Sequence, residues 1–306
     1  MTLQQLRYLI AISEHGSINA AAQSLYVSQS NLSTAIKELE NELEITIFTR
    51  SNRGVTLTND GTELLGYARQ VIEQADMMEE RYTRDRNKRM HLAVSTQHYY
   101  FSLQAFINVA EQCASEKYDF TLRECATGQI IEDVRTFRSD IGVLYLDSFN
   151  RRVLEKVLSD ADLSFSPLFN AHVHVFVGEQ HPLAQRSSVS LDDLNPYPRY
   201  SFEQGTTNSF YYSEEPFGHV PCDRNIRVTD RGTLTNLLTS FNGYTVSTGV
   251  LSSEMHHGIV AIPLEVDELM RVGYVTHNRR LPGTLLTRYI EELHRVIDSN
   301  ASVDPL

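Results

Sequence analysis

Three short helical patterns follow one another at the start of this 306-residue chain. Apolar residues recur with a period near 3.6 in residues 3–15, 18–25 and 29–43, which predicts three helices. Gly16 is a natural C-terminal signal for the first helix, and Ser17 can cap the second. A connection of only three residues, 26–28, then leads into the third helix, so the second and third helices must pack closely.

The third pattern separates apolar from polar residues. On a helix with about 100° per residue, Leu32, Ile36, Leu39 and Leu43 fall within about 60° and form a buried stripe. A separate arc of about 140° carries hydroxyl, amide and amine groups but no acid. Its members are Gln29, Ser30, Ser33, Thr34 and Lys37. Such side chains near a helix N-terminus reach base edges and phosphates in the major groove, which predicts a helix-turn-helix. An ordinary solvated Ser/Thr face is the alternative.

The next segment, ITIFTRSNRGVTLT, alternates apolar and polar residues around Asn52-Arg53-Gly54. This alternation predicts two strands and a tight turn. Arg50 and Arg53 flank the tip, where they suit DNA phosphates or the minor groove as a wing. The complete set of expected DNA contacts is Ser17, Ser28, Gln29, Ser30, Asn31, Ser33, Thr34, Lys37, Arg50 and Arg53.

A long helical pattern begins near residue 59, with Asn59 or Asp60 as its cap, and ends in the basic sequence DRNKR, which resembles a hinge. Its apolar stripe needs a partner. That stripe contains Leu64, Leu65, Ala68, Val71, Ile72, Ala75 and Met78. We expect contact with a second copy of the chain, and packing against its own domain is the alternative.

The charge is unevenly distributed. The whole chain has a formal charge of −12, and residues 1–90 hold 10 Lys and Arg against 12 Asp and Glu, so most of the acidity lies in residues 91–306. This balance argues against nonspecific coating of nucleic acid or anionic membranes, but it permits a local DNA-binding surface. We see neither a membrane span nor a signal peptide and expect a cytoplasmic protein.

Cysteine and histidine usage gives little support for a structural or catalytic metal. Cys113, Cys125 and Cys222 have neither CxxC spacing nor a regular pattern, so we expect reduced structural thiols. His172 and His174 would share one face of a strand, which leaves a metal site as a hypothesis. Motifs for a nucleophile elbow, a P-loop, a dinucleotide fold and a zinc protease are missing, so we expect no enzyme and no cofactor.

Beyond residue 90, short β-rich runs alternate with helical patterns, which predicts an α/β domain with mostly parallel sheets. Its size favours two subdomains with a cleft between them. Hydroxyl and amide side chains stand where strands lead into helices, and such junctions suit a carboxylate or similar anion. Helix capping alone is the alternative at each junction.

The N-terminal sequence GSINAAAQSLYVSQSNLSTAIKELENELEITIFTRSNRGVTLTNDG resembles the winged helix-turn-helix of LysR-type transcriptional regulators. The match spans about residues 3–66, and HPLA with LDDL near residues 181–194 resembles the C-terminal domain of that family. Ser30, Asn31 and Thr34 depart from the family pattern, which commonly has Pro, a small residue and Arg there.

The resemblance implies a DNA-binding domain over 1–58, a linker helix and hinge over 59–89, and an effector-binding domain over 90–306. The last is expected to have two lobes, like periplasmic binding proteins, with lobe I at about 91–161 and 267–306 and lobe II at about 162–266. It implies a ligand-responsive regulator that acts as an activator, binds promoter DNA with dyad symmetry as a homodimer or homotetramer, and contacts RNA polymerase.

A small-molecule effector is expected in the cleft. Its expected contacts are Ser95, Thr96, Gln97, Thr127, Gly128, Gln204, Thr206, Thr207 and Thr229. The competing hypothesis is a solute-binding module whose N-terminal helices serve only oligomerisation.

Overall fold

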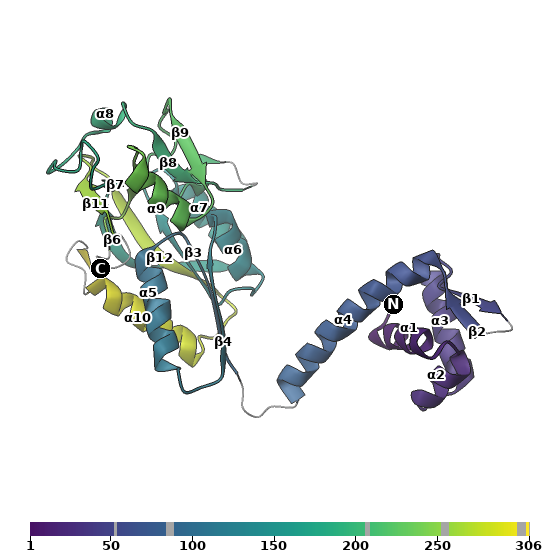
Figure 1. The fold of residues 1–306 in the computed structure, drawn as a ribbon. Coiled ribbons are helices and arrows are strands. Elements are labelled where there is room, and N and C mark those ends of the chain that lie inside the picture. The colour runs from purple at the N-terminus through teal and green to yellow at the C-terminus, as the bar shows by residue number, and fades with distance from the viewer. Residues whose placement is uncertain (52–53, 84–88, 206–208, 252–256, 299–303, 306) are drawn as a thin grey trace. The chain divides into compact units, whose positions relative to one another are not determined.

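A computed structural model describes residues 1–306 except 52–53, 84–88, 206–208, 252–256, 299–303 and 306. The chain divides into two compact units, Met1–Lys88 and Arg89–Leu306. Each is described by itself (Figure 1). No helix in the described ranges is both long enough and apolar enough to cross a membrane.

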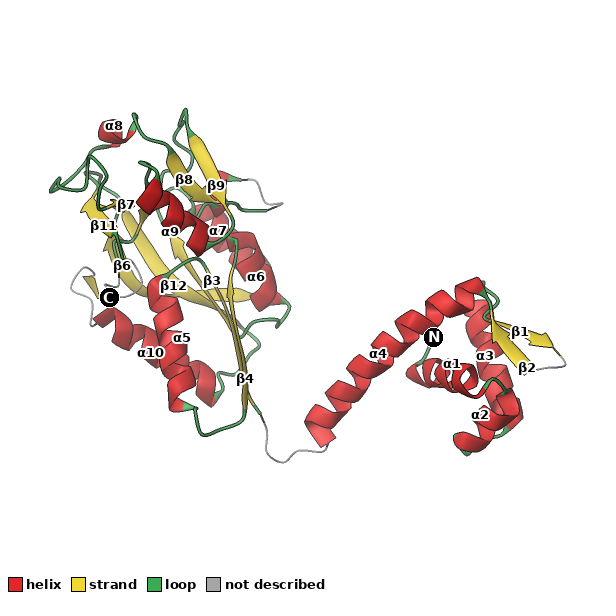
Figure 2. Ribbon diagram, in the orientation of Figure 1, coloured by secondary structure: helices red, strands yellow, loops and turns green. Residues whose placement is uncertain are grey.

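The first unit is a three-helix cluster followed by a hairpin and a long helix (Figure 2). Its elements are α1 (Leu3–His15), α2 (Ile18–Ser24), α3 (Gln29–Leu43), β1 (Phe48–Ser51), β2 (Gly54–Leu57) and α4 (Asn59–Thr83). The three helices and the antiparallel hairpin confirm the secondary structure predicted from periodicity.

Helix ends in this unit follow local capping chemistry. Gly16 ends α1 in the left-handed conformation, at φ 61°, and Ser17 caps α2 by accepting a hydrogen bond from the Ala20 amide. The expected cap of α4 was wrong: Thr58, rather than Asn59 or Asp60, accepts the bond from the Gly61 amide through its hydroxyl. Both expected residues already lie inside the helix.

The core of the first unit joins all three helices to the hairpin. Leu9, Leu32 and Leu39 are fully buried together with Ile47, which precedes the hairpin. Glu40 on α3 accepts hydrogen bonds from the amides of Ile47 (2.7 Å) and Phe48 (3.2 Å), so its carboxylate holds the hairpin against the helix. The wing is therefore positioned by the helix that carries the expected DNA-contacting face.

Helix α4 uses only part of its apolar stripe within its own unit. Ala68 is buried, and Leu64, Leu65 and Ile72 pack partly against the core of the first unit. Three other side chains on this helix remain largely exposed: Tyr67 (59%), Val71 (42%) and Met78 (61%). Packing against its own domain, the alternative, thus accounts for part of the stripe, and contact with a second copy stays a prediction for the exposed part.

The second unit is built around a six-stranded sheet with the order β13-β6-β12-β5-β3-β4. The strands are β3 (Met90–Thr96), β4 (Tyr118–Glu124), β5 (Ile141–Leu146), β6 (Leu163–His172), β12 (Leu269–His277) and β13 (Asp304–Pro305). Helices α5 (Tyr100–Gln112) and α10 (Thr284–Asp298) pack on one face, and α6 (Thr127–Arg135) and α7 (Arg151–Asp160) pack on the other (Figure 1).

Smaller sheets form the other part of this unit. A three-stranded sheet has the order β10-β7-β11, and β8 pairs with β9. The elements are β7 (His174–Gly178), α8 (Leu191–Leu194), β8 (Arg199–Phe202), the 3-10 helix η1 (Phe210–Tyr212), β9 (Asn225–Val228), α9 (Arg231–Ser240), β10 (Thr245–Ser247) and β11 (Ile259–Pro263).

The expectation of mostly parallel sheets was wrong, because the α/β unit has mixed sheets. Strand β3 is parallel to β4 and β5, but β12 is antiparallel to both β5 and β6, and β7 is antiparallel to β10 and β11. Since β6 still belongs to the six-stranded sheet, the chain passes to the smaller sheets at Val173, later than the expected boundary near residue 162.

Candidate DNA-binding surface and ligand cavity

The N-terminal turns of α3 present a polar surface. Its exposed members are Gln29, Ser30, Asn31, Thr34 and Lys37, and Ser33 is half-buried. The buried stripe of Leu32, Ile36 and Leu39 fixes the opposite side of the helix. The two flanking serines act locally, because the hydroxyls of Ser17 and Ser28 accept bonds from the Ala20 and Asn31 amides.

The basic tip of the hairpin is only partly described. Arg50 lies in β1, where its backbone pairs with Val55, and Arg53 lies outside the described residues. Two of the four acidic residues on or beside α3 are engaged: Glu40 holds the hairpin, and Glu42 forms an ion pair with the N-terminal ammonium group. The exposed polar face of α3 therefore carries the positive charge of Lys37.

Sequence reasoning missed Tyr26, in the turn between α2 and α3. Its side chain is 98% exposed, and its backbone is left-handed at φ 54°. A bulky residue in this conformation is uncommon, since steric repulsion disfavours it. The sequence signal that could have identified Tyr26 is an aromatic residue in a connection of only three residues between two helices.

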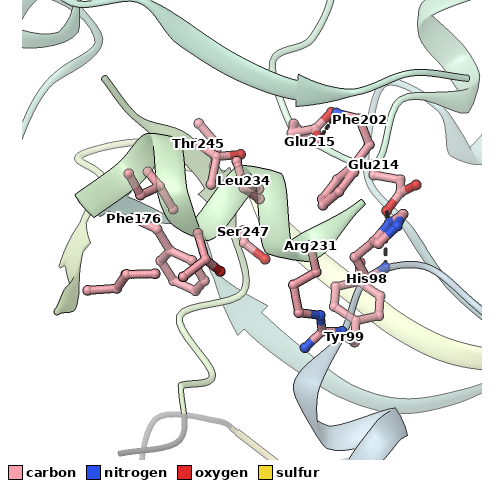
Figure 3. Close-up of a pocket in the computed structure, with 14 residues that line it drawn as sticks. His98, Tyr99, Phe176, Phe202, Glu214, Glu215, Arg231, Leu234, Thr245 and Ser247 are labelled. Carbon is pink, nitrogen blue, oxygen red and sulfur yellow. Dashed lines mark hydrogen bonds and ion pairs between the residues drawn. The ribbon is translucent and has the colours of Figure 1, made fainter. Parts of the chain in front are cut away.

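A small cavity that opens to solvent lies in the second unit (Figure 3), with about 50 Å³ of space for the centres of water-sized spheres. His98 and Tyr99 enter it from the junction between β3 and α5, and the remaining lining comes from the smaller sheets, α9 and the segment after η1. The residues that line it on that side include Phe176, Phe202, Glu214, Glu215, Arg231, Leu234, Leu238, Ser247 and Ile259.

His98 connects the two parts of the second unit at the cavity wall. Its Nδ1 lies 2.8 Å from Oε2 of Glu214, and its backbone N–H donates to the same oxygen at 3.1 Å. Its ring stacks on Phe202, the last residue of β8. Both side chains of this hydrogen-bonded pair are nearly buried, at 6% and 5% exposure.

A hydrogen-bonded chain beside the cavity unites three of the expected effector contacts. Nε2 of Gln97 donates to the Thr127 hydroxyl at 2.7 Å, and the Thr127 amide donates to Oε1 of Gln204 at 3.0 Å. An anion was expected at the N-terminus of α6. The side-chain amide of Gln204, which follows β8 of the smaller sheets, occupies this position instead. These residues join the two parts directly.

The remaining expected contacts lie apart from that chain. The Ser95 hydroxyl donates to Asp133 (2.7 Å), and the Thr96 hydroxyl donates to the Gln97 carbonyl (2.7 Å). Thr229 is exposed and Gly128 half-buried, and neither lines the cavity. Thr206 and Thr207 lie outside the described residues.

The cavity wall carries an excess of carboxyl groups. Burial and the neighbouring Glu214 carboxylate raise the pKa of Glu215 to about 8, although Glu215 accepts bonds from the Phe202 amide (2.8 Å) and the Ser213 hydroxyl (3.1 Å). Burial, followed by the charges of Glu214, Glu215 and Asp147, raises the pKa of Tyr99 well above its usual value. Sequence reasoning missed the acidic pair, and its only signal was Glu-Glu within an aromatic loop.

Metal binding finds no support in the described ranges, where no group of three or more His, Cys, Asp or Glu side chains is arranged around a common point. Nδ1 of His174 lies 2.8 Å from the carbonyl oxygen of His172, so the two imidazoles do not converge through that nitrogen. All three cysteines are free thiols.

Comparison with known proteins matches both units to one family. Residues 3–62 match the model for "Bacterial regulatory helix-turn-helix protein, lysR family", and residues 116–298 match "LysR substrate binding domain". The fold and site thus define a DNA-binding transcriptional regulator with a ligand-binding domain. The chain belongs to the LysR family, whose members bind DNA and form oligomers.

Full-length relatives have similar organisation. The chain is 26% identical over 308 residues to the "DNA-binding transcriptional dual regulator OxyR" of Escherichia coli, covering 97% of this chain and 95% of that protein. It is 24% identical over 303 residues to the "Hydrogen peroxide-inducible genes activator" of Dickeya chrysanthemi, covering 96% and 93%. These relatives are transcriptional regulators.

Solved structures share the fold. A cysteine mutant of Corynebacterium glutamicum OxyR matches with a TM-score of 0.53 at 19% identity, over 97% of this chain and 93% of that one. A mutant of full-length BenM matches with a TM-score of 0.50 at 20% identity, over 99% of both chains. At these identities the likeness concerns the fold alone.

Proposed function

We propose that this protein is a cytoplasmic transcription activator that recognises promoter DNA through α3 and responds to a small molecule in the cavity of its second unit. The exposed, acid-free face of α3, held by a buried stripe, is the observation that carries DNA recognition. Side chains of this kind at the start of a recognition helix read base edges, while cationic groups bind phosphates. The solute-binding alternative gives this face no role.

The proposed DNA contacts remain those expected from the sequence, with Tyr26 added at the turn. Ser17 and Ser28 act through the helix amides that they cap, and Ser30, Thr34 and Lys37 meet the groove. Arg50 and Arg53 of the wing contact DNA phosphates or the minor groove. Footprinting of the full chain on the promoter region beside its own gene tests this proposal: a protected, salt-sensitive site of dyad symmetry supports it, and uniform weak binding to any fragment contradicts it.

We assign self-association to α4. Its exposed residues Tyr67, Val71 and Met78 lie on one side of the helix and suit a second copy of the same face. In this proposal, residues 1–58 bind DNA, residues 59–89 form the linker and dimer contact, and residues 90–306 bind the effector. In the assembled regulator, ligand-dependent movement of the two lobes changes the spacing of paired DNA-binding units and so the contact with RNA polymerase.

The Dickeya chrysanthemi relative, which is named for hydrogen peroxide, suggests a second candidate, in which a cysteine of this chain reacts with peroxide. Thiol reactivity needs the thiolate. Burial and the charge of Asp133 raise the pKa of Cys125 to about 12, and Cys113 is 1% exposed within the core. The third thiol, on Cys222, donates a hydrogen bond to the Arg224 carbonyl. We therefore favour reversible ligand binding over thiol oxidation.

A further inference from the structure

Two helices of the second unit begin without a side-chain cap of their own. Tyr99 and Ala126 occupy the N-cap positions of α5 and α6, and neither side chain accepts a hydrogen bond from its helix. Backbone N–H groups at the start of a helix have no partner within the helix and need an acceptor from elsewhere. The acceptors at these two helix starts therefore have to come from another segment of the chain.

Both acceptors belong to the smaller part of the unit. Oε2 of Glu214 accepts the bond from the His98 N–H, just before α5, at 3.1 Å. Oε1 of Gln204 accepts the bond from the N–H of Thr127, the first residue of α6, at 3.0 Å. Nε2 of Gln204 also donates to Oε1 of Glu214 at 3.3 Å. One connected pair of side chains thus caps two helices that pack on the six-stranded sheet.

A third contact joins the same two parts. Arg231, the first residue of α9, pairs through Nη2 with Glu124, the last residue of β4, and the two side chains are 20% and 24% exposed. Strand β4 runs parallel to β3, which leads to His98. The carboxyl ends of parallel strands form the edge at which α/β sheets bind ligands. In this chain, side chains of the smaller part cover that edge.

Little space remains beside these contacts. His98, Glu214 and Arg231 line the small cavity, which has about 50 Å³ for the centres of water-sized spheres (Figure 3). One water molecule needs about 10–15 Å³ of such space. The cavity formed by the described residues therefore has room for only a few water molecules, and a larger ligand reaches the two helix starts only after these side chains withdraw.

We propose that Gln204, Glu214 and Arg231 form a latch, a built-in ligand that closes the two parts of the second unit on each other. The inference goes beyond the proposed function, because the latch acts before any small molecule binds and whether or not the chain binds DNA. If only the open form admits the effector, the apparent affinity is reduced by the fraction of open molecules. The latch then sets the effector concentration to which the regulator responds.

Hydrogen exchange of the full chain tests the latch, measured by mass spectrometry with fragmentation that resolves single amides. The amides of His98 and Thr127 report directly, because each donates to a latch side chain. Both should be protected in the parent, and both should exchange when the latch opens. Unprotected amides at these two positions in the parent would overturn the proposal.

Arg231→Leu is the decisive variant, because Arg231 contacts neither reporting amide. Loss of its bridge to Glu124 should lower the protection of the His98 and Thr127 amides together, by about fivefold or more. Arg227→Leu, at an exposed position of β9, is the matched control and should exchange like the parent. Parental protection of both amides in Arg231→Leu would show that the three contacts act separately and would overturn the latch.

Gln204→Ala tests the latch from the other side. The Thr127 amide loses its acceptor directly, so the informative amide is that of His98, which should also lose protection. Glu203→Ala, at the exposed neighbouring position, is the control. Amides within β12 should keep parental protection in both variants, because opening the latch leaves the sheet intact. Loss confined to Thr127, or an equal loss in β12, would contradict a latch.

The same proteins are assayed for binding to the promoter fragment, which separates this inference from the proposed function. Absence of specific DNA binding by the parent refutes the proposed function and leaves the exchange result to decide the latch. Specific DNA binding together with parental exchange in both latch variants refutes the latch and leaves the regulator standing.

Discussion

The imidazole of His98 lies on the ring of Phe202, with the centroids 3.6 Å apart and the planes 3° from parallel. His98 follows β3 of the six-stranded sheet, and Phe202 ends β8 of the smaller part. Together with the His98–Glu214 pair, this stack ties the two parts of the second unit at the cavity wall. Ligand binding and the relative position of the two parts should therefore be coupled.

A double-mutant cycle measures this connection. His98→Ala leaves the buried Glu214 carboxylate without its imidazole partner, so we expect the free energy of unfolding to fall by about 2–4 kcal/mol. Glu214→Gln in the same background should then cost less than it does alone, giving a coupling energy of about 1 kcal/mol or more by denaturant unfolding. Additive effects would show that the pair contributes no connection.

Glu215 gives the second unit a pH-dependent stability. Its pKa is about 8 in the folded chain against an ordinary value of 4.5, so folding favours the protonated form. The resulting stabilisation is complete below pH 4.5 and is lost as the pH rises toward 8. The titratable groups that face it are Glu214 beside it, His98 and Tyr99 after β3, and Tyr145 and Asp147 at the end of β5.

Glu215→Gln mimics the protonated carboxyl and should remove this dependence. Thermal unfolding across pH 5–8 should show the variant gaining stability relative to the parent as the pH rises. Glu203→Gln, at an exposed position, is the control and should follow the parent curve. A constant difference between Glu215→Gln and the parent over this window would contradict the assignment.

Lys37 tests the electrostatic part of DNA binding. Removing one phosphate contact should weaken binding to every fragment by a similar factor and reduce the slope of log affinity against log salt by about 1. Fluorescence anisotropy of Lys37→Ala at several salt concentrations measures this slope. Lys117→Ala, at an exposed position of the second unit, should leave affinity and slope unchanged.

Replacing Tyr26 by glycine should raise the stability of the first unit and lower its affinity for DNA. Tyr26→Gly relieves the left-handed backbone and removes almost no burial, so we expect a gain of about 0.5–1 kcal/mol in the free energy of unfolding. The same change should weaken promoter binding several-fold, because the exposed side chain adjoins the start of α3. A more stable variant with undiminished DNA binding would remove Tyr26 from the interface.

Val71 tests the exposed face of α4. Val71→Glu places a charge in the proposed contact between copies and should shift the protein toward monomers in sedimentation. Val71→Ile keeps the face apolar and should retain the parental state. An unchanged association state in both variants would place self-association elsewhere.

Local patterns predicted the first unit well and the cavity poorly. The stripe of Leu32, Ile36 and Leu39 defined α3 from Gln29 to Leu43 because period and burial agree along a helix. The direction of a strand within a sheet has no such local signal. The sequence therefore did not predict that β12 pairs antiparallel with β5. The predicted polar junctions satisfy one another, as Gln97 and Thr127 do.

The cavity therefore depends on side chains far apart in the chain. His98 and Glu214 meet only through the crossing of the chain between the two parts. Sequence could identify His98 as part of an aromatic segment but could not show which carboxylate would reach it. The three predicted contacts that do meet, Gln97, Thr127 and Gln204, were expected to bind the effector and are found bonded to one another.

The most direct test of the whole account measures promoter affinity of the full chain while the face of α3 is altered. The parent should bind the promoter region beside its own gene specifically, with a preference over unrelated fragments of equal length. The double variant Ser30→Ala, Thr34→Ala should lose the preference for that site while remaining folded. Undiminished specific binding by the double variant, or parental binding that shows no preference for the promoter, would contradict a ligand-responsive regulator that reads DNA through this helix.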